Sequence, residues 1–68
     1  MGMSRAEAMA IIHSDRQKLE DSKNNVMKNT REMDLANCNG WTTMESASAE
    51  IQSAITQLSN ALLELDIQ

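Results

Sequence analysis

Few residues in this sequence could carry out chemistry, and each of them stands alone. His13 is the single histidine and Cys38 the single cysteine, so the histidine has no second ligand beside it and the thiol has no adjacent base. This count also excludes a zinc site of the usual Cys and His clusters. Asp15 could act as an acid, but Arg16 and Lys18 lie close to it and favour a structural role. We therefore expect a surface histidine, a loop thiol, no catalytic residue, no metal site and no cofactor.

Two further patterns could bind a partner rather than react with it. Trp41 is the only aromatic residue, and such a side chain either clamps a turn onto the end of a helix bundle or serves as an exposed anchor for recognition. Arg16 and Lys23 lie seven positions apart and would share one helix face. That pair is either a basic stripe, which a symmetric dimer would double, or an ordinary solvated face.

The elements that must position these residues are two long helices. Apolar residues recur every seven positions, which keeps one seam of a helix facing a partner helix. The seam consists of Ile12, Leu19, Val26 and Met33 in the first half and Met44, Ile51, Leu58 and Leu65 in the second. Taken in reverse order, the second set pairs with the first at equal distances from Cys38 and Asn39. The sequence therefore predicts an all-α fold, an antiparallel two-helix hairpin with these eight residues as its core.

Local signals mark where each helix begins and ends. Ser4 with Glu7, and Thr42 with Glu45, both fit the capping box that starts a helix. Asparagine and glycine between them tolerate the left-handed conformation that ends one. The predicted single domain, residues 1–68, has a first helix over about 4–36, a loop over 37–41 and a second helix over about 42–66.

The two predicted helices differ in the width of their apolar faces. The second adds a row of alanines, flanked by two larger residues: Ala47, Ala54 and Ala61, with Ile55 and Leu62. The matching row of the first is small and mostly polar: Ala8, Asp15, Ser22 and Asn29. These side chains are too short to cover Ile55 and Leu62, so apolar surface should be left over. We expect Ile55, Leu62, Met9 and Ile11 to contact a second molecule in a four-helix bundle, either a homodimer or a heterodimer.

Length and charge narrow the class of partner. A chain of 68 residues rarely builds a self-sufficient core without a disulfide, a metal or a partner. All six basic residues precede the turn, so the second helix carries the whole net charge of −4, which disfavours binding to nucleic acid. No apolar run approaches the ~20 residues of a membrane span or forms a signal peptide. We expect a cytoplasmic protein, or one exported without a cleavable signal peptide.

The order of features around the turn resembles the WXG family of small helical hairpins, which carry a tryptophan between their two helices. Here an asparagine- and glycine-containing stretch precedes Trp41, and a helix follows it. Two family features are missing: Thr43 stands where the family has glycine, and the chain has no tyrosine for the C-terminal export signal. The resemblance implies a dimeric four-helix bundle exported by type VII secretion, with the signal on a partner or on a longer form of the chain.

These observations favour a non-enzymatic helical interaction module, because two helices without a pocket offer chemistry no enclosed site. We expect a secretion-associated partner or targeting factor for a type VII-like system. A second interpretation is a small RNA-binding four-helix-bundle regulator that uses Arg16 and Lys23. A third is a phage-type inhibitor or a cytosolic secretion chaperone, which nothing in the sequence separates from the first.

Overall fold

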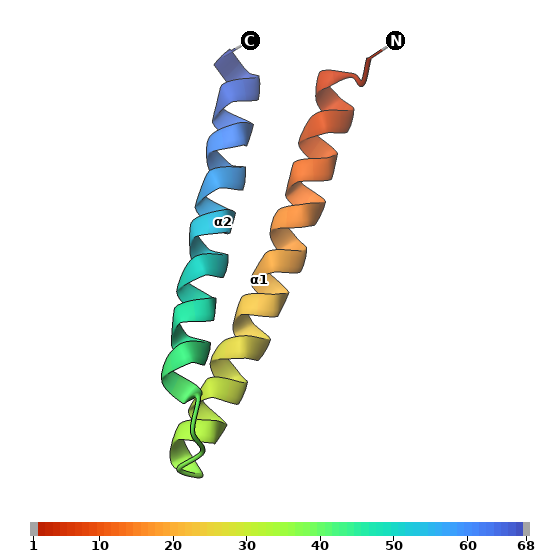
Figure 1. The fold of residues 1–68 in the computed structure, drawn as a ribbon. Helices are drawn as coiled ribbons and strands as arrows, with labels where there is room; N and C mark the ends of the chain where they lie inside the picture. Colours follow the sequence, from red (N-terminus) through yellow and green to blue (C-terminus); the bar gives the residue numbers. More distant parts are fainter. Residues whose placement is uncertain (1, 68) are drawn as a thin grey trace.

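The computed structural model describes residues 2–67 as two antiparallel α-helices. Helix α1 spans Arg5–Leu35 and helix α2 spans Trp41–Ile67, with a short loop between them (Figure 1). The start of α1 and the end of α2 lie at the same end of the molecule, opposite the loop. This arrangement confirms the predicted all-α helical hairpin. The molecule is a rod with principal dimensions of 52 × 16 × 15 Å.

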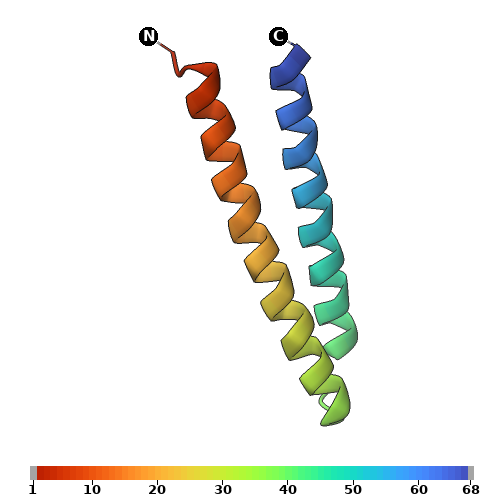
Figure 2. The same ribbon diagram turned by 180° about the vertical axis from the view of Figure 1, so that it is seen from behind.

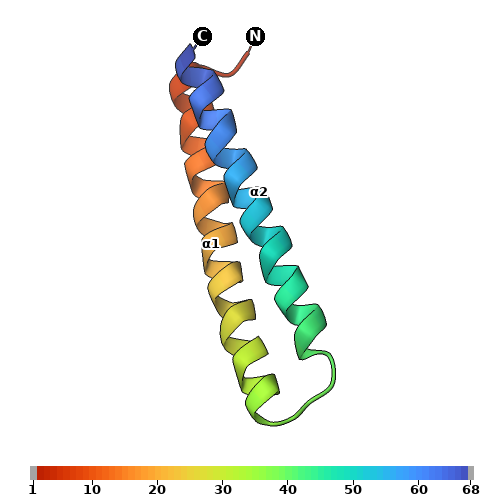
Figure 3. The same ribbon diagram turned by 90° about the vertical axis from the view of Figure 1, so that its left-hand side faces the viewer.

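The two helix axes are inclined to one another rather than parallel. In Figure 1, and from behind in Figure 2, they diverge toward the chain ends and approach each other near the loop. In the perpendicular view of Figure 3 they overlap toward the chain ends and separate at the loop. An inclination of this kind is typical of packed helix pairs, in which side-chain ridges of one helix enter grooves of the other.

Helix α1 begins and ends where the sequence signals indicate. The Ser4 hydroxyl accepts a hydrogen bond from the Glu7 amide at 3.1 Å, which satisfies one unpaired amide of the first turn. At the other end Asn37 takes a positive φ of 59°. The Cys38 amide then donates to the Met33 carbonyl at 2.8 Å, and the Asn37 amide to the Asp34 carbonyl at 3.0 Å. This pair of bonds is the Schellman motif, which ends a helix at a left-handed residue.

Helix α2 begins one residue earlier than predicted, so the capping box at Thr42 is wrong. Trp41, expected in the loop, is the first residue of the helix. The Gly40 carbonyl accepts the first helical hydrogen bond, from the Met44 amide at 3.0 Å. Gly40 has a φ of +99°, a conformation that glycine adopts without the penalty other residues incur. The glycine therefore turns the chain into the helix before Thr42 is reached.

The hairpin buries little of its apolar surface. Ile55, at 2 % exposure, is the one buried apolar residue among residues 2–67, and Thr30 is the one buried polar residue, at 6 %. All eight predicted core residues are half-buried: Ile12, Leu19, Val26, Met33, Met44, Ile51, Leu58 and Leu65. The accessible surface is 5160 Å², against about 4,300 Å² for a compact monomer of 7.6 kDa. Two helices cannot enclose their own seam.

The second inner row of α1 differs from the predicted one. Asp15, Ser22 and Asn29 are exposed, and of that row only Ala8 is half-buried. The row four residues beyond the seam faces α2 instead: Met9, Arg16, Lys23 and Thr30. The long aliphatic stems of arginine and lysine cover apolar surface that aspartate and serine cannot reach.

This rotation of α1 also overturns the prediction that Ile55 is left uncovered. Ile55 is buried inside the hairpin itself, so it is not available to a second molecule. Leu62, from the same row of α2, is half-buried. On the other side of the seam, Leu19 and Leu58 line a groove that stays open.

Candidate interaction surface

Two grooves run along the hairpin, one on each side of the seam. The first, here called the Trp41 groove, has a volume of about 420 Å³ and is lined by Met27, Thr30, Arg31, Asp34, Trp41, Glu45 and Ser48. The second, here called the Leu58 groove, has a volume of about 630 Å³ and is lined by Asp15, Lys18, Leu19, Ser22, Ala54, Gln57 and Leu58. The two grooves lie on opposite sides of the seam. Thr30, four residues after a seam residue, lines the first groove, and Ser22, three residues after one, lines the second. On an α-helix these two positions project to opposite sides of the seam.

The Trp41 groove places the indole beside a charged rim near the loop. Trp41 is half-buried, and Met27 on the facing helix is 52 % exposed. Thr30 forms the buried wall, and its hydroxyl donates to the Val26 carbonyl at 2.6 Å. Asp34 and Glu45 add negative charge to the same groove. A half-buried indole fits both predicted roles, because one part packs on the hairpin and the rest stays accessible.

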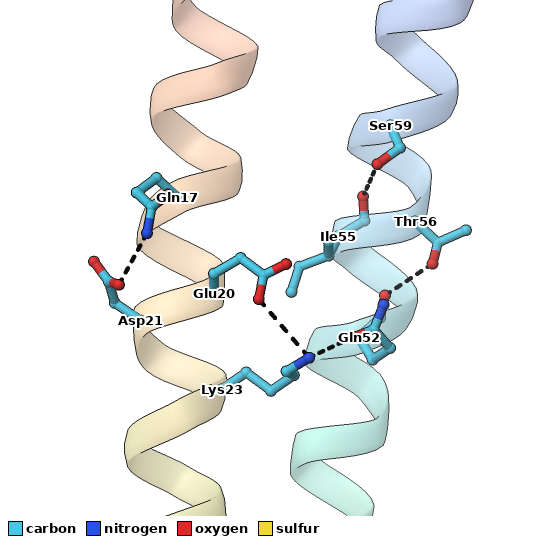
Figure 4. A network of polar contacts seen from close by, with 8 residues as sticks. All are labelled: Gln17, Glu20, Asp21, Lys23, Gln52, Ile55, Thr56 and Ser59. Atoms are coloured by element: carbon cyan, nitrogen blue, oxygen red, sulfur yellow. Dashed lines mark hydrogen bonds and ion pairs between the residues drawn. The ribbon is translucent and has the colours of Figure 1, made fainter.

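Beside the buried Ile55, polar side chains bridge the two helices (Figure 4). The Lys23 ammonium donates to Gln52 Oε1 at 2.6 Å and lies 3.8 Å from Glu20 Oε2. The Ile55 side chain points from α2 toward α1, beside Glu20. Lys23 and Glu20 retain only 21 % and 35 % side-chain exposure. These side chains act as a cover for Ile55 rather than as a free charged surface.

The basic stripe expected from Arg16 and Lys23 is therefore drawn into the hairpin. Both residues are half-buried. Within residues 2–67, Arg16 Nε is the one buried side-chain nitrogen or oxygen that has no hydrogen-bond partner. Phosphate binding needs accessible cations. The Lys23 ammonium is already hydrogen-bonded to Gln52 and paired with Glu20. This arrangement gives no support to nucleic-acid binding by the stripe.

The Leu58 groove is the more apolar of the two. Leu19 and Leu58 line it together, at the level that the antiparallel pairing predicts. Ala54 lies beside them, and its small side chain leaves the groove open. Asp15, Lys18 and Gln57 stand exposed at the rim.

The exposed Ile11 belongs to the same side of the hairpin as this groove. It lies seven residues before Lys18 and so shares that edge of α1, and it is 46 % exposed. Of the four residues predicted to meet a second molecule through leftover apolar surface, Ile11 is the exposed one. Met9 and Leu62 are both half-buried. Leu62 shares the α2 row of Ile55, and Met9 belongs to the α1 row that faces it.

The residues considered for chemistry are dispersed. His13, Asp15 and Cys38 are all exposed, and within residues 2–67 no three His, Cys, Asp or Glu side chains gather into a possible metal site. Over the same residues, neither helix is long and apolar enough to cross a membrane. At the open end of the hairpin an exposed ion pair joins Arg5 to Asp66 at 3.1 Å.

Sequence reasoning missed Thr30 and the position of the Leu58 groove for one reason. It assigned the second inner row of α1 to the positions three beyond each seam residue. The row that faces α2 lies four residues beyond each seam residue and has Met9 and Thr30 at its ends. These two apolar or small side chains were the signal in the sequence that this row is the inner one. Choosing between the rows needs the rotation of α1 about its own axis, which the three-dimensional packing sets.

Comparison with known proteins finds no family model, no curated protein and no solved structure that matches this chain. The resemblance to the WXG family therefore stays a prediction from the residues around Trp41. Function has to be inferred from the surface of the hairpin.

Proposed function

We propose that this hairpin is a non-enzymatic interaction module that completes its core by packing against another helical protein. The observation that carries the proposal is the burial of a single apolar side chain, Ile55, within residues 2–67. The eight seam residues are only half-buried, so part of their apolar surface stays in contact with water. A second layer of helices would bury them further.

The surface that best supports this association is the Leu58 groove. It exposes part of Leu19 and Leu58 in a hollow bounded by the small Ala54. An apolar helix face fits such a hollow, because small residues let two helices approach closely and the leucines then pack from both sides. The Trp41 groove has a more charged rim and is the secondary contact in this proposal.

Within this class of protein, we assign the hairpin to a secretion-associated partner or targeting role of the type VII kind. The support is the resemblance around Trp41, together with a half-buried indole at the first residue of α2. The role is tested by expressing the chain in a host with an intact type VII machinery and in one with its ATPase disabled. Release into the medium, or co-purification with an exported protein, that depends on the ATPase would support it. Identical behaviour in the two hosts would reject it.

The interaction module itself is tested by dilution. We expect circular dichroism to show incomplete helicity in the dilute isolated chain, and helicity and melting temperature that rise when the concentration of the chain or of its partner rises, since association stabilises by mass action. A fully helical, cooperatively melting monomer at the lowest measurable concentration would overturn the proposal, because such a hairpin needs no second layer.

A matched pair of variants locates the surface involved. Ala54→Glu places a charge in the Leu58 groove, and Ala49→Glu places the same charge at an exposed position of α2. We expect the first to abolish the stabilisation by concentration or by partner, and the second to preserve it. Equal effects of the two substitutions would remove the groove from the proposal.

A further inference from the structure

We propose that the loop between the helices holds a self-modification site, at which Asn39 deamidates spontaneously and becomes aspartate or isoaspartate. The proposal is independent of the helix-packing function. It rests on three properties of the loop: glycine follows the asparagine, both residues are exposed, and the backbone amide of Gly40 is free. Water is the one other reactant.

The reaction uses the backbone of the chain as its nucleophile. The Gly40 nitrogen loses its proton to water or hydroxide and attacks Cγ of the Asn39 side chain. A bond forms between this nitrogen and Cγ, the bond from Cγ to Nδ2 breaks, and Nδ2 takes up a proton and leaves as ammonia. The cyclic succinimide that remains then adds one water molecule. Opening at Cγ gives aspartate, and opening at the backbone carbonyl gives isoaspartate.

The space around Gly40 permits this attack. Glycine has no Cβ, so another group can approach its backbone closely. A Cβ built on Gly40 would meet Met33 Cε at 3.8 Å and no other atom of the surrounding structure within 4 Å. Asn39 and Gly40 are both exposed, and the loop forms an open arc at one end of the molecule (Figure 3). Water therefore reaches the nitrogen and the succinimide.

The amide that must react is not held by the fold. Within residues 2–67 the Gly40 amide donates no hydrogen bond to another backbone group. The loop contains a second asparagine, Asn37, and there the following amide, that of Cys38, donates to the Met33 carbonyl at 2.8 Å. Such a bond retains the proton and fixes the nitrogen in place. Asn37 should therefore be protected in the same loop that exposes Asn39.

The other asparagines are protected by the helices. Asn24, Asn25 and Asn29 lie within α1, and Asn60 lies within α2. The amide that follows each of them belongs to the hydrogen-bond ladder of its helix, and each following residue has a side chain. The reaction should therefore be confined to Asn39.

Deamidation would change the loop in charge and in length. Both products carry a carboxylate, which is ionised at neutral pH, so the chain gains a negative charge two residues before Trp41. In the aspartate form this charge lies at the N-terminus of α2, where the helix dipole favours it. In the isoaspartate form the backbone gains one carbon atom ahead of Gly40, whose φ of +99° leads the chain into α2. The two products should therefore differ in how firmly α2 begins.

Ageing of the full chain in mildly alkaline buffer tests the proposal. A protease that cuts after glutamate releases residues 33–45, and fragmentation of this peptide in a mass spectrometer separates Asn37 from Asn39. We expect the mass gain of an amino group replaced by a hydroxyl at Asn39 and not at Asn37. The rate should lie within severalfold of the rate at Asn39 in the chain unfolded by urea.

Two results of this experiment would contradict the proposal. A rate at Asn39 about tenfold or more below that of the unfolded chain would mean that the fold adds ~1.4 kcal/mol or more to the barrier. Equal reaction at Asn37 and Asn39 in the folded chain would show that the free amide does not select the site.

A matched pair of variants assigns the mass gain. Asn39→Gln keeps an amide at the same exposed position, where no positive φ is required, but the attack would have to close a larger ring, so the gain should disappear. Asn60→Gln makes the same change at an exposed position of α2 and should leave the gain unaltered. A gain of the same size in Asn39→Gln would refute the assignment.

Hydrogen exchange measured by NMR tests the free amide without waiting for the covalent reaction. The Gly40 amide should exchange at a rate close to that of an unstructured chain, and the Cys38 amide should exchange at least severalfold more slowly, because it is bonded to the Met33 carbonyl. Equal protection of the two amides would overturn the structural basis of the proposal.

Discussion

At the scale of single residues, Arg16 holds the least favourable position in the hairpin. Its stem covers the contact between the helices, while its Nε is buried and has no hydrogen-bond partner. A buried donor without a partner loses its bonds to water and gains none in return, at a cost of about 1 to 3 kcal/mol. The apolar stem of Arg16 therefore stabilises the hairpin, whereas its guanidinium, with the buried Nε, destabilises it.

We predict that Arg16→Met increases the free energy of unfolding by about 1 kcal/mol, because it keeps an unbranched apolar stem and removes the unpaired donor. The measurement is urea denaturation followed by circular dichroism at a fixed protein concentration. The control is Arg31→Met at an exposed position, where the change should stay within about 0.5 kcal/mol. Destabilisation by Arg16→Met would show that the charge itself contributes to the fold.

Trp41 is the second residue whose position decides between two roles. It is half-buried at the start of α2 and lines the Trp41 groove together with Thr30. We predict that Trp41→Ala lowers the free energy of unfolding by roughly 1 to 2 kcal/mol, about half the cost of losing a fully buried aromatic. Leu35→Ala, at a residue 78 % exposed near the same loop, should have almost no effect.

Fluorescence of the single tryptophan separates the clamp from the anchor. Emission from the isolated hairpin that is already blue-shifted and protected from quenchers would support a clamp. A shift to the blue only when a helical partner is added, with near-normal stability of Trp41→Ala, would support an anchor. Red-shifted emission that no partner changes would count against both roles.

At the scale of the elements, the two ends of the loop are set by residues that accept unusual backbone angles. Asn37 ends α1 with φ of 59° and Gly40 precedes α2 with φ of +99°. A side chain at Gly40 would have room, since the nearest atom to its Cβ would be Met33 Cε at 3.8 Å. The constraint there is the backbone angle and not space.

We predict that Gly40→Ala lowers the free energy of unfolding by about 1 to 2 kcal/mol, because an L-residue other than glycine is strained at this φ. The matched control is Gly2→Ala, where the new Cβ meets nothing within 4 Å and no positive φ is required. Thermal melts of both variants at one concentration give the comparison. An unchanged Gly40→Ala melt would mean that the loop relaxes to another conformation.

The register of the two helices can be trapped covalently. Leu19 and Leu58 line the same groove, so in a Cys38→Ser background we predict that Leu19→Cys with Leu58→Cys forms an intramolecular disulfide under mild oxidation, which needs Cα atoms about 4.4 to 6.8 Å apart. Leu19→Cys with Leu65→Cys is the control, because two further turns place its thiols about 10 Å out of register. Efficient closure of the control pair instead would show a different register.

At the scale of the whole molecule, the hairpin is too elongated to enclose a core. Its radius of gyration is 15.8 Å, against about 11 Å for a compact domain of this length. The seam residues are shielded on the sides that face the other helix and open on the sides that do not. A second layer along the rod would cover them without lengthening the molecule.

We predict that small-angle X-ray scattering shows this lateral growth. As concentration rises, the scattering mass should double while the maximum dimension stays close to that of the dilute hairpin, because both proposed layers run along the same 52 Å axis. End-to-end association would nearly double the maximum dimension and would contradict lateral packing through the Leu58 groove.

The sequence by itself determined the helices, their antiparallel order and the stop of α1. Heptad spacing of Ile12, Leu19 and their equivalents needs only the helical repeat, and the Ser4 cap and the Asn37 stop depend on a few neighbouring residues. Signals of this kind are local, so most of them persist in the folded chain. The exception is the Thr42 capping box, because Gly40 turns the chain into α2 before Thr42 is reached.

The tertiary structure alone decided which flank of α1 faces α2. The row that contains Asp15 and the row that contains Arg16 lie on either side of the seam. Both rows are mostly polar, so polarity alone did not show which of them faces α2. Packing selected the row with the long stems of Arg16 and Lys23, because these cover Ile55, and the rotation left the Leu58 groove open on the opposite side. The location of the candidate interface therefore follows from helix rotation, a property of the assembled pair that neither helix encodes alone.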